Sequence, residues 1–381
     1  MASHTDIRPN GLRERAWVEV NRSALVSNLR TVKTAVGPRV KLIPMVKANG
    51  YGLGVREVVR SFQQEGVFAF GVASLEEGRQ LRRLGVTQPV MIHSPVCPTS
   101  LEGVAADGLQ VTVSDLDGLR ALAAAAGDAA SPVPFQIEVD TGMGRSGFAA
   151  RDCGAWWPEV RASMAGLALS GVWTHLHSAD SDCLDSARDQ VDRFEAVVQT
   201  LSPLPEGCLV HFANSAAALR LPSSFGNAAR PGIFLYGGMV GQGAPEPEAV
   251  VRVMGRVDLV RDVAEGTTLG YGATHVAGGP ARWATVGIGY GDGLPRALGN
   301  RGHALVRGTR VPIIGRISMD VSVVDITPVG EVRPGDAVTF VGSDGPANVA
   351  LEEVAGLAGT IGYEVLTGLS PRLPRVWAEQ P

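Results

Sequence analysis

The chain has 381 residues, 45% of them hydrophobic and 19% charged, with a formal net charge of -4. This length predicts two domains, and the composition is that of a folded globular protein, which excludes a disordered chain. The small negative charge and the lack of a basic run argue against a nucleic-acid partner.

The first 15 residues are polar and lack the apolar core of a signal peptide. No apolar run reaches the roughly 20 residues needed to span a bilayer. The four cysteines form no CxxC pair, which argues against a zinc ribbon or a disulfide framework. We therefore expect a cytoplasmic protein with no membrane partner and a frayed tail at 1–15.

Residues 16–243 alternate short apolar strands with amphipathic helices. A strand at 16–20 comes first, and the further candidates are 41–47, 68–73, 89–94, 109–113, 134–140, 169–177, 209–213 and 233–238. Ser74 and Asp115 are suitable N-caps for two of the helices. Strands that are apolar throughout indicate a parallel sheet covered on both faces. Strand–helix units in this number favour a closed (β/α)₈ barrel of the TIM type over an open sheet.

Residues 244–381 differ in texture. Long runs rich in Val, Arg and Thr follow one another with Gly or Pro turns, and only 348–359 has a helical pattern. This part is predicted to be a separate, mainly β domain. The whole chain is therefore expected to have an α/β fold, a barrel followed by a β domain.

Lys47 ends the first of the strand candidates that follow 16–20, where the chain turns into PMVKANGYGLG. Barrel enzymes build their active sites at this carboxyl end of the strands. A lysine whose pKa is lowered by burial can form a Schiff base with a carbonyl compound. The simpler alternative is a solvated lysine that closes a strand. The spacing of Lys47, Asn49 and Tyr51 before a Gly-x-Gly turn favours the reactive lysine.

The segment VKANGYGLG resembles the cofactor-lysine motif V-K-A-N-A-Y-G-H-G of alanine racemases. Further similar segments are DTGMGRSGF (140–148), WTHLHSAD (173–180), HFANSAA (211–217), ARPGIFLYG (229–237), GYGATH (270–275), GYGDG (289–293) and SMD (318–320). So many motifs in this order make the resemblance strong. It implies a pyridoxal-phosphate-dependent isomerase that interconverts L-alanine and D-alanine, for D-alanine biosynthesis. It also implies a barrel that binds the cofactor and a C-terminal β domain.

The resemblance implies that Lys47 carries pyridoxal phosphate covalently. The other residues implied to bind the cofactor are Tyr51, His175, Asn214, Ser215, Arg230, Gly232 and Ile233. Arg230 would face the pyridine nitrogen and leave it unprotonated, because a guanidinium does not readily give up a proton. Such a ring is a weaker electron sink, which discourages transamination. His175 would lie against the ring, and His211 would orient Arg230.

Each of these histidines, taken alone, is more typical of a satisfied polar group at a strand end. His175 and His177 stand two residues apart in the stretch WTHLH, which could suggest metal ligands. We predict no metal site at this stretch.

Tyr271 is implied to be the second catalytic base. Racemisation removes a proton from one face of Cα and delivers one to the other, so bases on both sides, Lys47 and Tyr271, solve the geometry. A free tyrosine has a pKa near 10, so it needs a hydrogen-bond donor nearby, for which His275 or Arg296 is the candidate. Without the other motifs, the pattern favours a turn aromatic between glycines for Tyr271.

By the same resemblance, Tyr271 enters the site from a partner subunit, which implies an obligate head-to-tail homodimer. Arg145 would bind the substrate carboxylate, with the backbone at Met319 of the other chain assisting and Asp320 in a supporting role. The entrance would be narrowed by three residues, Asp180, Tyr290 and Arg296.

The sequence departs from the family pattern in two places. Many members have a lysine, carbamylated to supply negative charge, seven residues before the arginine that corresponds to Arg145; here Glu138 stands there. We expect the Glu138 carboxylate to orient Arg145 directly; the alternative is a surface charge beside a helix. Pro371 occupies the place of a tyrosine that contacts the phosphate. Proline cannot donate a hydrogen bond, so cofactor affinity should be lower.

Three other functions have to be weighed against alanine racemisation. A racemase of serine or of several amino acids has the same motifs. A decarboxylase of the same barrel class is disfavoured by Arg230, because loss of CO₂ demands a strong electron sink. A cofactor-binding protein without catalytic activity is disfavoured by the long β domain that carries Tyr271 and Met319.

Overall fold

The computed structural model describes residues 14–127, 129–221 and 226–379. Most of the tail predicted at 1–15 therefore lies outside the described residues. The chain forms two compact units. The barrel unit comprises 26–235 and 239–247, and the C-terminal unit comprises 14–25, Tyr236–Gly238 and 248–379.

The barrel unit is built on a parallel sheet. Its strands, in spatial order, are β2 (Lys41–Leu42), β10 (Ala228–Ala229), β9 (Leu209–Ala213), β8 (Leu167–Trp173), β6 (Val133–Asp140), β5 (Leu109–Val113), β4 (Val90–Ile92) and β3 (Phe70–Val72). A parallel bridge between Met45 and Gly71 joins the two ends of this sheet. The Val46 N–H also donates to the Gly71 carbonyl at 2.8 Å. The predicted barrel is confirmed.

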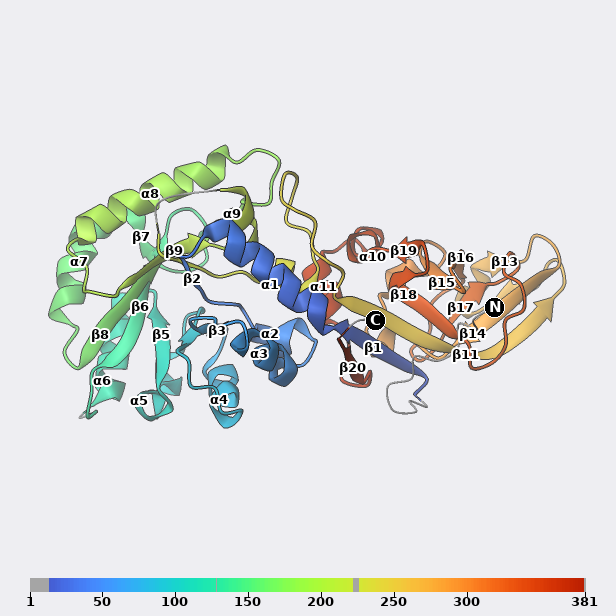
Figure 1. Cartoon of the computed structure of the whole chain (residues 1–381), viewed down its shortest axis with the longest axis horizontal. Coiled ribbons are helices and arrows are strands. Elements are labelled where there is room, and N and C mark those ends of the chain that lie inside the picture. Colours follow the sequence, from blue (N-terminus) through green and yellow to red (C-terminus); the bar gives the residue numbers. More distant parts are fainter. Residues whose placement is uncertain (1–13, 128, 222–225, 380–381) are drawn as a thin grey trace. The chain divides into compact units, whose positions relative to one another are not determined.

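Helices lie outside the barrel strands (Figure 1). They are α1 (Arg22–Val36), α3 (Val55–Gln63), α4 (Leu75–Arg83), α5 (Val104–Asp107), α6 (Leu116–Ala126), α7 (Cys153–Ala162), α8 (Asp185–Leu201) and α9 (Ser215–Arg220). The two predicted N-caps are confirmed: the side chain of Ser74 accepts from the Glu77 N–H, and that of Asp115 accepts from the Gly118 N–H. Each cap satisfies a backbone donor that the first helical turn leaves unpaired.

The strand predicted at 233–238 is wrong. That segment forms a 3₁₀ turn, η3 (Ile233–Tyr236), and the eighth barrel strand is the two-residue β10. The cause is a side chain from another element. Ser215 Oγ accepts from the N–H groups of Gly232 at 2.7 Å and Phe234 at 3.4 Å. Because these donors face a hydroxyl, they are not available to a strand ladder.

The first strand, β1 (Ala16–Asn21), belongs to the C-terminal unit. It pairs antiparallel with β11 (Val251–Val263) and parallel with β20 (Arg375–Ala378). The barrel range predicted to begin at residue 16 is therefore wrong at its start. Polar Glu19 on this strand makes an ion pair of 2.8 Å with Arg252 on the neighbouring strand. Such a polar position within an apolar strand is typical of an antiparallel sheet with one solvated face.

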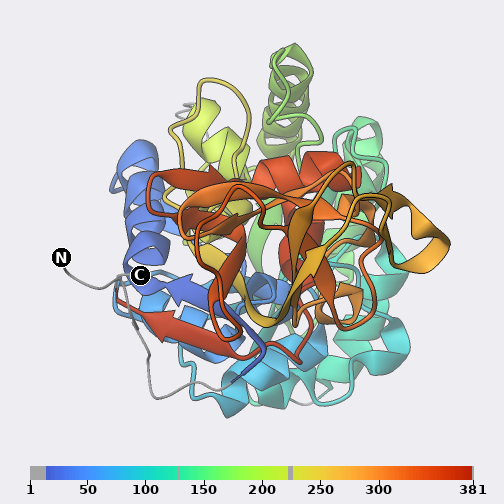
Figure 2. The same cartoon turned by 90° about the vertical axis from the view of Figure 1, so that its right-hand side faces the viewer.

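The rest of the C-terminal sheet is antiparallel, and most of its strands are orange to red in Figure 2. Its other strands are β14 (Ala281–Val286), β15 (His303–Val306), β16 (Thr309–Ile314), β17 (Ser322–Asp325), β18 (Ala337–Asp344) and β19 (Ala347–Val349). Helix α10 (Leu351–Ala358) lies within the helical pattern predicted at 348–359, and α11 (Gly362–Thr367) follows it. The mainly β character of this part is confirmed.

None of the helices in the described ranges is both long and apolar enough to cross a membrane.

Candidate active site

Lys47 leaves β2 in a left-handed turn, α2 (Lys47–Tyr51). Residues 48–51 have φ values of 52°, 56°, 64° and 53°. L-residues pay roughly 1–2 kcal/mol each for this conformation, so surrounding contacts must hold the turn. Within it, the Gly50 N–H donates to the Val46 carbonyl at 2.9 Å. Several strained residues in succession beside a reactive side chain are typical of a functional site.

Glu77 on α4 ties this turn to the next strand. One carboxylate oxygen accepts from the Ala48 N–H at 2.6 Å, and the other accepts from the Ala73 N–H at 2.8 Å. The residue directly after Lys47 is therefore fixed by an ionic acceptor from a separate element. Sequence reasoning assigned Glu77 no role, although Ser74-x-x-Glu77 is a capping-box pattern.

Three cationic side chains at the carboxyl end of the barrel lie close enough to interact electrostatically. They are Lys47, Arg145 and Arg230. Burial lowers the pKa of the Lys47 amine, Arg145 and Arg230 lower it further, and Glu77 acts in the opposite direction. Solvent still reaches part of the Lys47 side chain, which keeps the amine accessible to a ligand. An amine with a lowered pKa is a better nucleophile and base, and the cluster favours an anionic ligand.

Arg230 is buried behind this amine. Its Nη1 lies 2.6 Å from His211 Nδ1, and its Nη2 donates to the Thr174 carbonyl at 2.8 Å. The guanidinium carbon lies 4.7 Å from the centre of the Trp173 ring. Burial lowers the pKa of Arg230 to about 9, and Glu138 counteracts part of that shift. Arg230 therefore remains a cation at neutral pH.

Three histidines, His93, His175 and His211, lie in the same part of the barrel. Burial, followed by the charge of Arg230, lowers the pKa of each of them, to about 3 for His175. Both ring nitrogens of His93 are buried and have no hydrogen-bond partner among the described residues. Its ring meets the Trp173 ring edge-on, with 5.2 Å between the centroids. All three imidazoles are therefore neutral at neutral pH.

Replacing His93 with leucine should make the cofactor-free protein less sensitive to acid. A histidine of the unfolded chain takes up a proton near pH 6.5, whereas His93 stays neutral in the folded protein. Because the unfolded state binds more protons below that pH, acid lowers the free energy of unfolding. One such histidine accounts for about 2 kcal/mol between about pH 7.5 and about pH 5.

Thermal unfolding followed across this pH range would measure the effect. His93→Leu should lose less stability on acidification than the wild type, and His177→Gln, at an exposed position, serves as the control. An unchanged acid dependence in His93→Leu would contradict the prediction.

Hydroxyl and amide groups gather at the carboxyl ends of β9 and β10. Ser215 begins α9, which Asn214 caps with its side chain, and Ser215 Oγ accepts from the Gly232 N–H. The Tyr51 hydroxyl lies so close to Gly232 that a Cβ there would overlap it. Ile233 begins η3 directly afterwards. Glycine at 232 thus allows a phenol, a hydroxyl and backbone N–H groups to approach one point.

Glu138 does not behave as the sequence predicted. It is buried, 3% exposed, and Ser114 Oγ donates to its carboxylate at 2.8 Å. Among the described residues, no ion pair joins Glu138 to Arg145, which lies exposed in the loop beyond β6. The alternative of a surface charge is also wrong, since the side chain is buried. Its charge acts on Arg230 instead.

Two loops of the barrel unit carry the predicted substrate and entrance residues Arg145 and Asp180, both exposed. The Arg145 loop is held by Asp140, whose Oδ1 accepts from the Gly142 N–H at 2.9 Å. The chain beside Asp180 is held by Arg220, which donates to the carbonyls on either side of it. Hydrogen bonds therefore hold the backbone in place close to both Arg145 and Asp180.

Tyr271 lies in the C-terminal unit, in a turn η4 (Tyr271–Ala273) between the paired strands β12 (Thr268–Leu269) and β13 (His275–Val276). Its side chain is 69% exposed. Within the described part of the chain, no hydrogen bond joins it to His275 or Arg296, the predicted donors. His275 packs against Trp283 instead, with ring centroids 5.5 Å apart. The guanidinium of Arg316 lies beside Gly272 in this turn.

The turn that contains Met319 is hydrogen-bonded to a second turn, η5 (Tyr290–Asp292). The Tyr290 N–H donates to the Ser318 carbonyl at 3.0 Å, and the Gly291 N–H donates to the Met319 carbonyl at 2.8 Å. Tyr290 and Met319 are both exposed, at 41% and 53%. Exposed Arg296 begins the next short turn, η6 (Arg296–Leu298).

Asp292 anchors these turns and was not predicted. It is fully buried and accepts from Arg15 at 2.7 Å and 3.0 Å. Arg372 lies 3.4 Å from the same carboxylate and donates to Asp320 at 2.6 Å. Asp320, predicted to support Met319, is thus one member of a charge network that joins four segments of the C-terminal unit.

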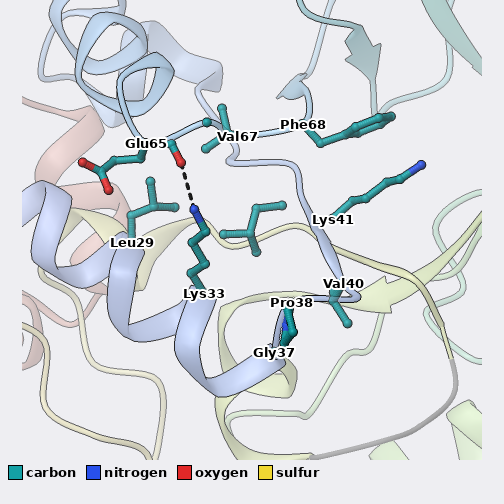
Figure 3. Close-up of a pocket in the computed structure, with 11 residues that line it drawn as sticks. Leu29, Lys33, Gly37, Pro38, Val40, Lys41, Glu65, Val67 and Phe68 are labelled. Atoms are coloured by element: carbon teal, nitrogen blue, oxygen red, sulfur yellow. Dashed lines mark hydrogen bonds between the residues drawn. The ribbon is translucent and has the colours of Figure 1, made fainter.

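A cavity of about 200 Å³ lies at the opposite end of the barrel strands from Lys47. Figure 3 shows Lys33 donating to the Glu65 carbonyl and Lys41 extending past the Phe68 ring. The cavity adjoins the start of β2, whereas barrel enzymes place their chemistry beyond the strand ends. We therefore do not assign it to the active site.

Comparison with known proteins gives a consistent result. Residues 20–240 match the family described as alanine racemase, N-terminal domain, and 250–377 match alanine racemase, C-terminal domain. The alanine racemase of Sorangium cellulosum is 38% identical over 379 residues, covering 95% of this chain and 98% of the relative.

Solved structures agree with the sequence matches. Alanine racemase from E. faecalis has a TM-score of 0.89 and 33% identity, covering 97% of this chain and 99% of its own. Alanine racemase from Bartonella henselae with covalently bound pyridoxal phosphate has a TM-score of 0.87 and 29% identity, covering 96% of this chain and 100% of its own.

Proposed function

This chain belongs to the alanine racemase family, and from that premise we infer that it interconverts L-alanine and D-alanine with pyridoxal phosphate as cofactor. The observation that carries the inference is the group of Lys47, Arg145 and Arg230. They form one cationic cluster, in which Lys47 has a lowered pKa. A carbonyl-reactive amine among cations suits a phosphorylated aldehyde and an amino-acid carboxylate.

The residues present fit the cofactor. Ser215, Tyr51 and the backbone at Ile233 would supply donors for a phosphate, beside the Gly232 N–H, which donates to Ser215 Oγ in this structure. Only a glycine at 232 leaves the phenol room. Asn214 holds the helix that Ser215 begins, and His175 lies beside Arg230. When bound, pyridoxal phosphate supplies the electron sink that makes the Cα proton of an amino acid removable.

Two side chains are proposed to move the proton. Lys47 Nζ would act on one face of Cα, and the phenol of Tyr271 on the other. Each would remove a proton in one direction of the reaction and return one in the other. Arg145 would orient the substrate through its carboxylate. Arg230, still a cation near neutrality, would limit how far charge spreads into the ring and so disfavour transamination and decarboxylation.

Tyr271 is proposed to act in the site of a partner subunit of a homodimer, together with the backbone at Met319. Support comes from exposure, since both side chains stand out from the C-terminal unit, at 69% and 53%. Exposed Tyr290 lies on a turn joined to that of Met319, and exposed apolar side chains that adjoin one another are typical of interaction surfaces. Asp180, Tyr290 and Arg296 would then narrow the entrance.

Replacing Glu138 with glutamine should weaken catalysis. The structure leads us to revise its role: its carboxylate is buried and raises the pKa of Arg230, so its loss leaves Arg230 without its principal counter-charge. We expect kcat/KM to fall about tenfold, from roughly 1.4 kcal/mol of lost stabilisation. Glu138→Asp, which keeps the charge, is the control. Full activity in Glu138→Gln would refute this role.

The function is tested by incubating the protein with L-alanine and pyridoxal phosphate, then separating the enantiomers and collecting any CO₂. Appearance of D-alanine without gas supports the proposal. Evolution of CO₂ would support a decarboxylase, and equal rates with serine would support a broad-specificity racemase. Borohydride reduction followed by peptide mapping should find the cofactor on Lys47; a label elsewhere would overturn the assignment of Lys47.

A further inference from the structure

Gln136 is a polar side chain in the middle of the otherwise apolar strand β6. It is completely buried, and its amide oxygen lies 2.9 Å from His211 Nε2. Its amide nitrogen faces the side-chain oxygen of Gln110 on the next strand at 3.4 Å. A buried amide on a barrel strand costs free energy unless it is hydrogen-bonded, so these contacts need an explanation.

The contact with Arg230 shows where the proton on His211 lies. A guanidinium has donors only, so His211 Nδ1, at 2.6 Å from Arg230 Nη1, has to accept. Burial and the charge of Arg230 hold the pKa of His211 well below its ordinary value, so the ring is neutral. A neutral imidazole that accepts at Nδ1 carries its hydrogen on Nε2. The atom of Gln136 that faces Nε2 must therefore be the amide oxygen.

The barrel is shaped to hold the Gln136 amide in place. A Cβ at Gly171, on the neighbouring strand β8, would lie 3.1 Å from the amide oxygen and 3.2 Å from the amide carbon. Real Cβ atoms rarely come so close, so glycine at 171 is what leaves space for Gln136. A glycine inside a strand otherwise weakens it.

We propose that Gln136 is a positioning residue: by accepting from His211 Nε2, it fixes the histidine tautomer that holds Arg230 in place. Gln136 does not itself contact Arg230 or Lys47. Its importance for catalysis rests on the proposed function, because Arg230 is there assigned to the cofactor ring. Its effect on His211 depends only on the contacts described above.

Two substitutions separate this role from simple packing. Gln136→Glu puts a carboxylate beside His211 Nε2 and favours a doubly protonated ring. Its Nδ1–H would then face the Arg230 donor, so the hydrogen bond between them is lost. Gln136→Met has a similar shape but leaves the His211 Nε2–H without an acceptor, so the tautomer is no longer enforced from that side.

The proton position can be read directly by nitrogen NMR of the full chain labelled with ¹⁵N-histidine, with pyridoxal phosphate bound and after its removal. The chain has 7 histidines, and His211→Asn identifies the signal that belongs to His211. In the wild type, His211 should show a bare Nδ1 and a protonated Nε2 at every pH at which the protein stays folded. In Gln136→Glu, the carboxylate should raise the pKa of His211 far enough for both ring nitrogens to carry a proton at the acid end of the pH range in which the protein stays folded.

Gln110→Met is the matched control, since it removes an amide from the same polar chain without touching His211. It should leave the His211 signal unchanged. Wild-type protein with a proton on Nδ1, or Gln136→Glu with unaltered His211 signals, would overturn the proposal. So would an equal response in the Gln110 and Gln136 variants.

A second measurement concerns catalysis. Gln136→Glu and Gln136→Met should each lower kcat/KM about tenfold, whereas Gln110→Met should not. If the His211 signals behave as expected but the protein does not racemise alanine, the proposed function fails and the positioning role stands. If alanine is racemised and the signals do not respond, the positioning role fails alone.

Discussion

A mixture of two variants, Lys47→Ala and Tyr271→Phe, is expected to recover about a quarter of wild-type activity after their subunits exchange. The reason is geometric. If each site takes Lys47 from one subunit and Tyr271 from its partner, a mixed dimer contains one site with both residues intact and one with neither. Random exchange makes about half of the dimers mixed, each with one working site of two.

Each variant alone should be nearly inactive. Removing a residue that transfers a proton costs about 10²–10⁴-fold in rate, and Lys47→Ala also removes the amine expected to carry the cofactor. The measurement is D-alanine formation before and after exchange, with the double variant Lys47→Ala/Tyr271→Phe mixed with wild type as control. No recovery in the first mixture, despite proven exchange, would contradict a shared site.

Asp292→Asn should lower the stability of the protein by about 3 kcal/mol, since removing one partner of a buried ion pair leaves the others uncompensated. Asp292 is fully buried, and its partners Arg15 and Arg372 are partly exposed, at 37% and 44%. Solvent therefore screens part of the loss, which keeps the expected figure at the low end of the range for buried pairs. Thermal or urea unfolding would measure it.

The same change should also affect the reaction. Asp292 joins the segment before β1 to the turns that carry Tyr290 and Met319, so its loss should raise KM for alanine more than it lowers kcat. Asp262→Asn is the control, because that carboxylate is 87% exposed and its ion pair with Arg282 is worth little. Equal stability in the two variants would show that the Asp292 network does not hold this region.

The barrel could be predicted because its strands are short, apolar and separated by helices with clear caps. The prediction failed where a pairing partner or an acceptor comes from far along the chain. The segment at 233–238 has the apolar character of a strand, but Ser215 accepts from the N–H groups of Phe234 within it and of Gly232 directly before it. The strand at 16–20 pairs with a segment more than 200 residues further along the chain. No pattern in the neighbouring sequence predicts that pairing.

The site residues were predicted from motifs, which identify the residues of a site but not the contacts that those residues make. Lys47 and Arg230 stand at strand ends, as expected, and His211 lies against Arg230. The expected pairing of Glu138 with Arg145 is absent from the described ion pairs, because position along a strand does not fix which cation a buried carboxylate faces. Gln136, Glu77 and Asp292 were missed because each acts through backbone or side chains of distant segments.

The place of β1 between β11 and β20 has a consequence for how the protein is made. The ribosome synthesises β1 first, but both strands that pair with it are synthesised only after the whole barrel. The edges of β1 therefore stay unpaired while the barrel folds. If the gene were split at the boundary of the barrel, β1 would remain on the barrel fragment, separated from the strands with which it pairs. A separately expressed C-terminal half would thus need β1 grafted to it, which favours a circular permutant over a simple truncation.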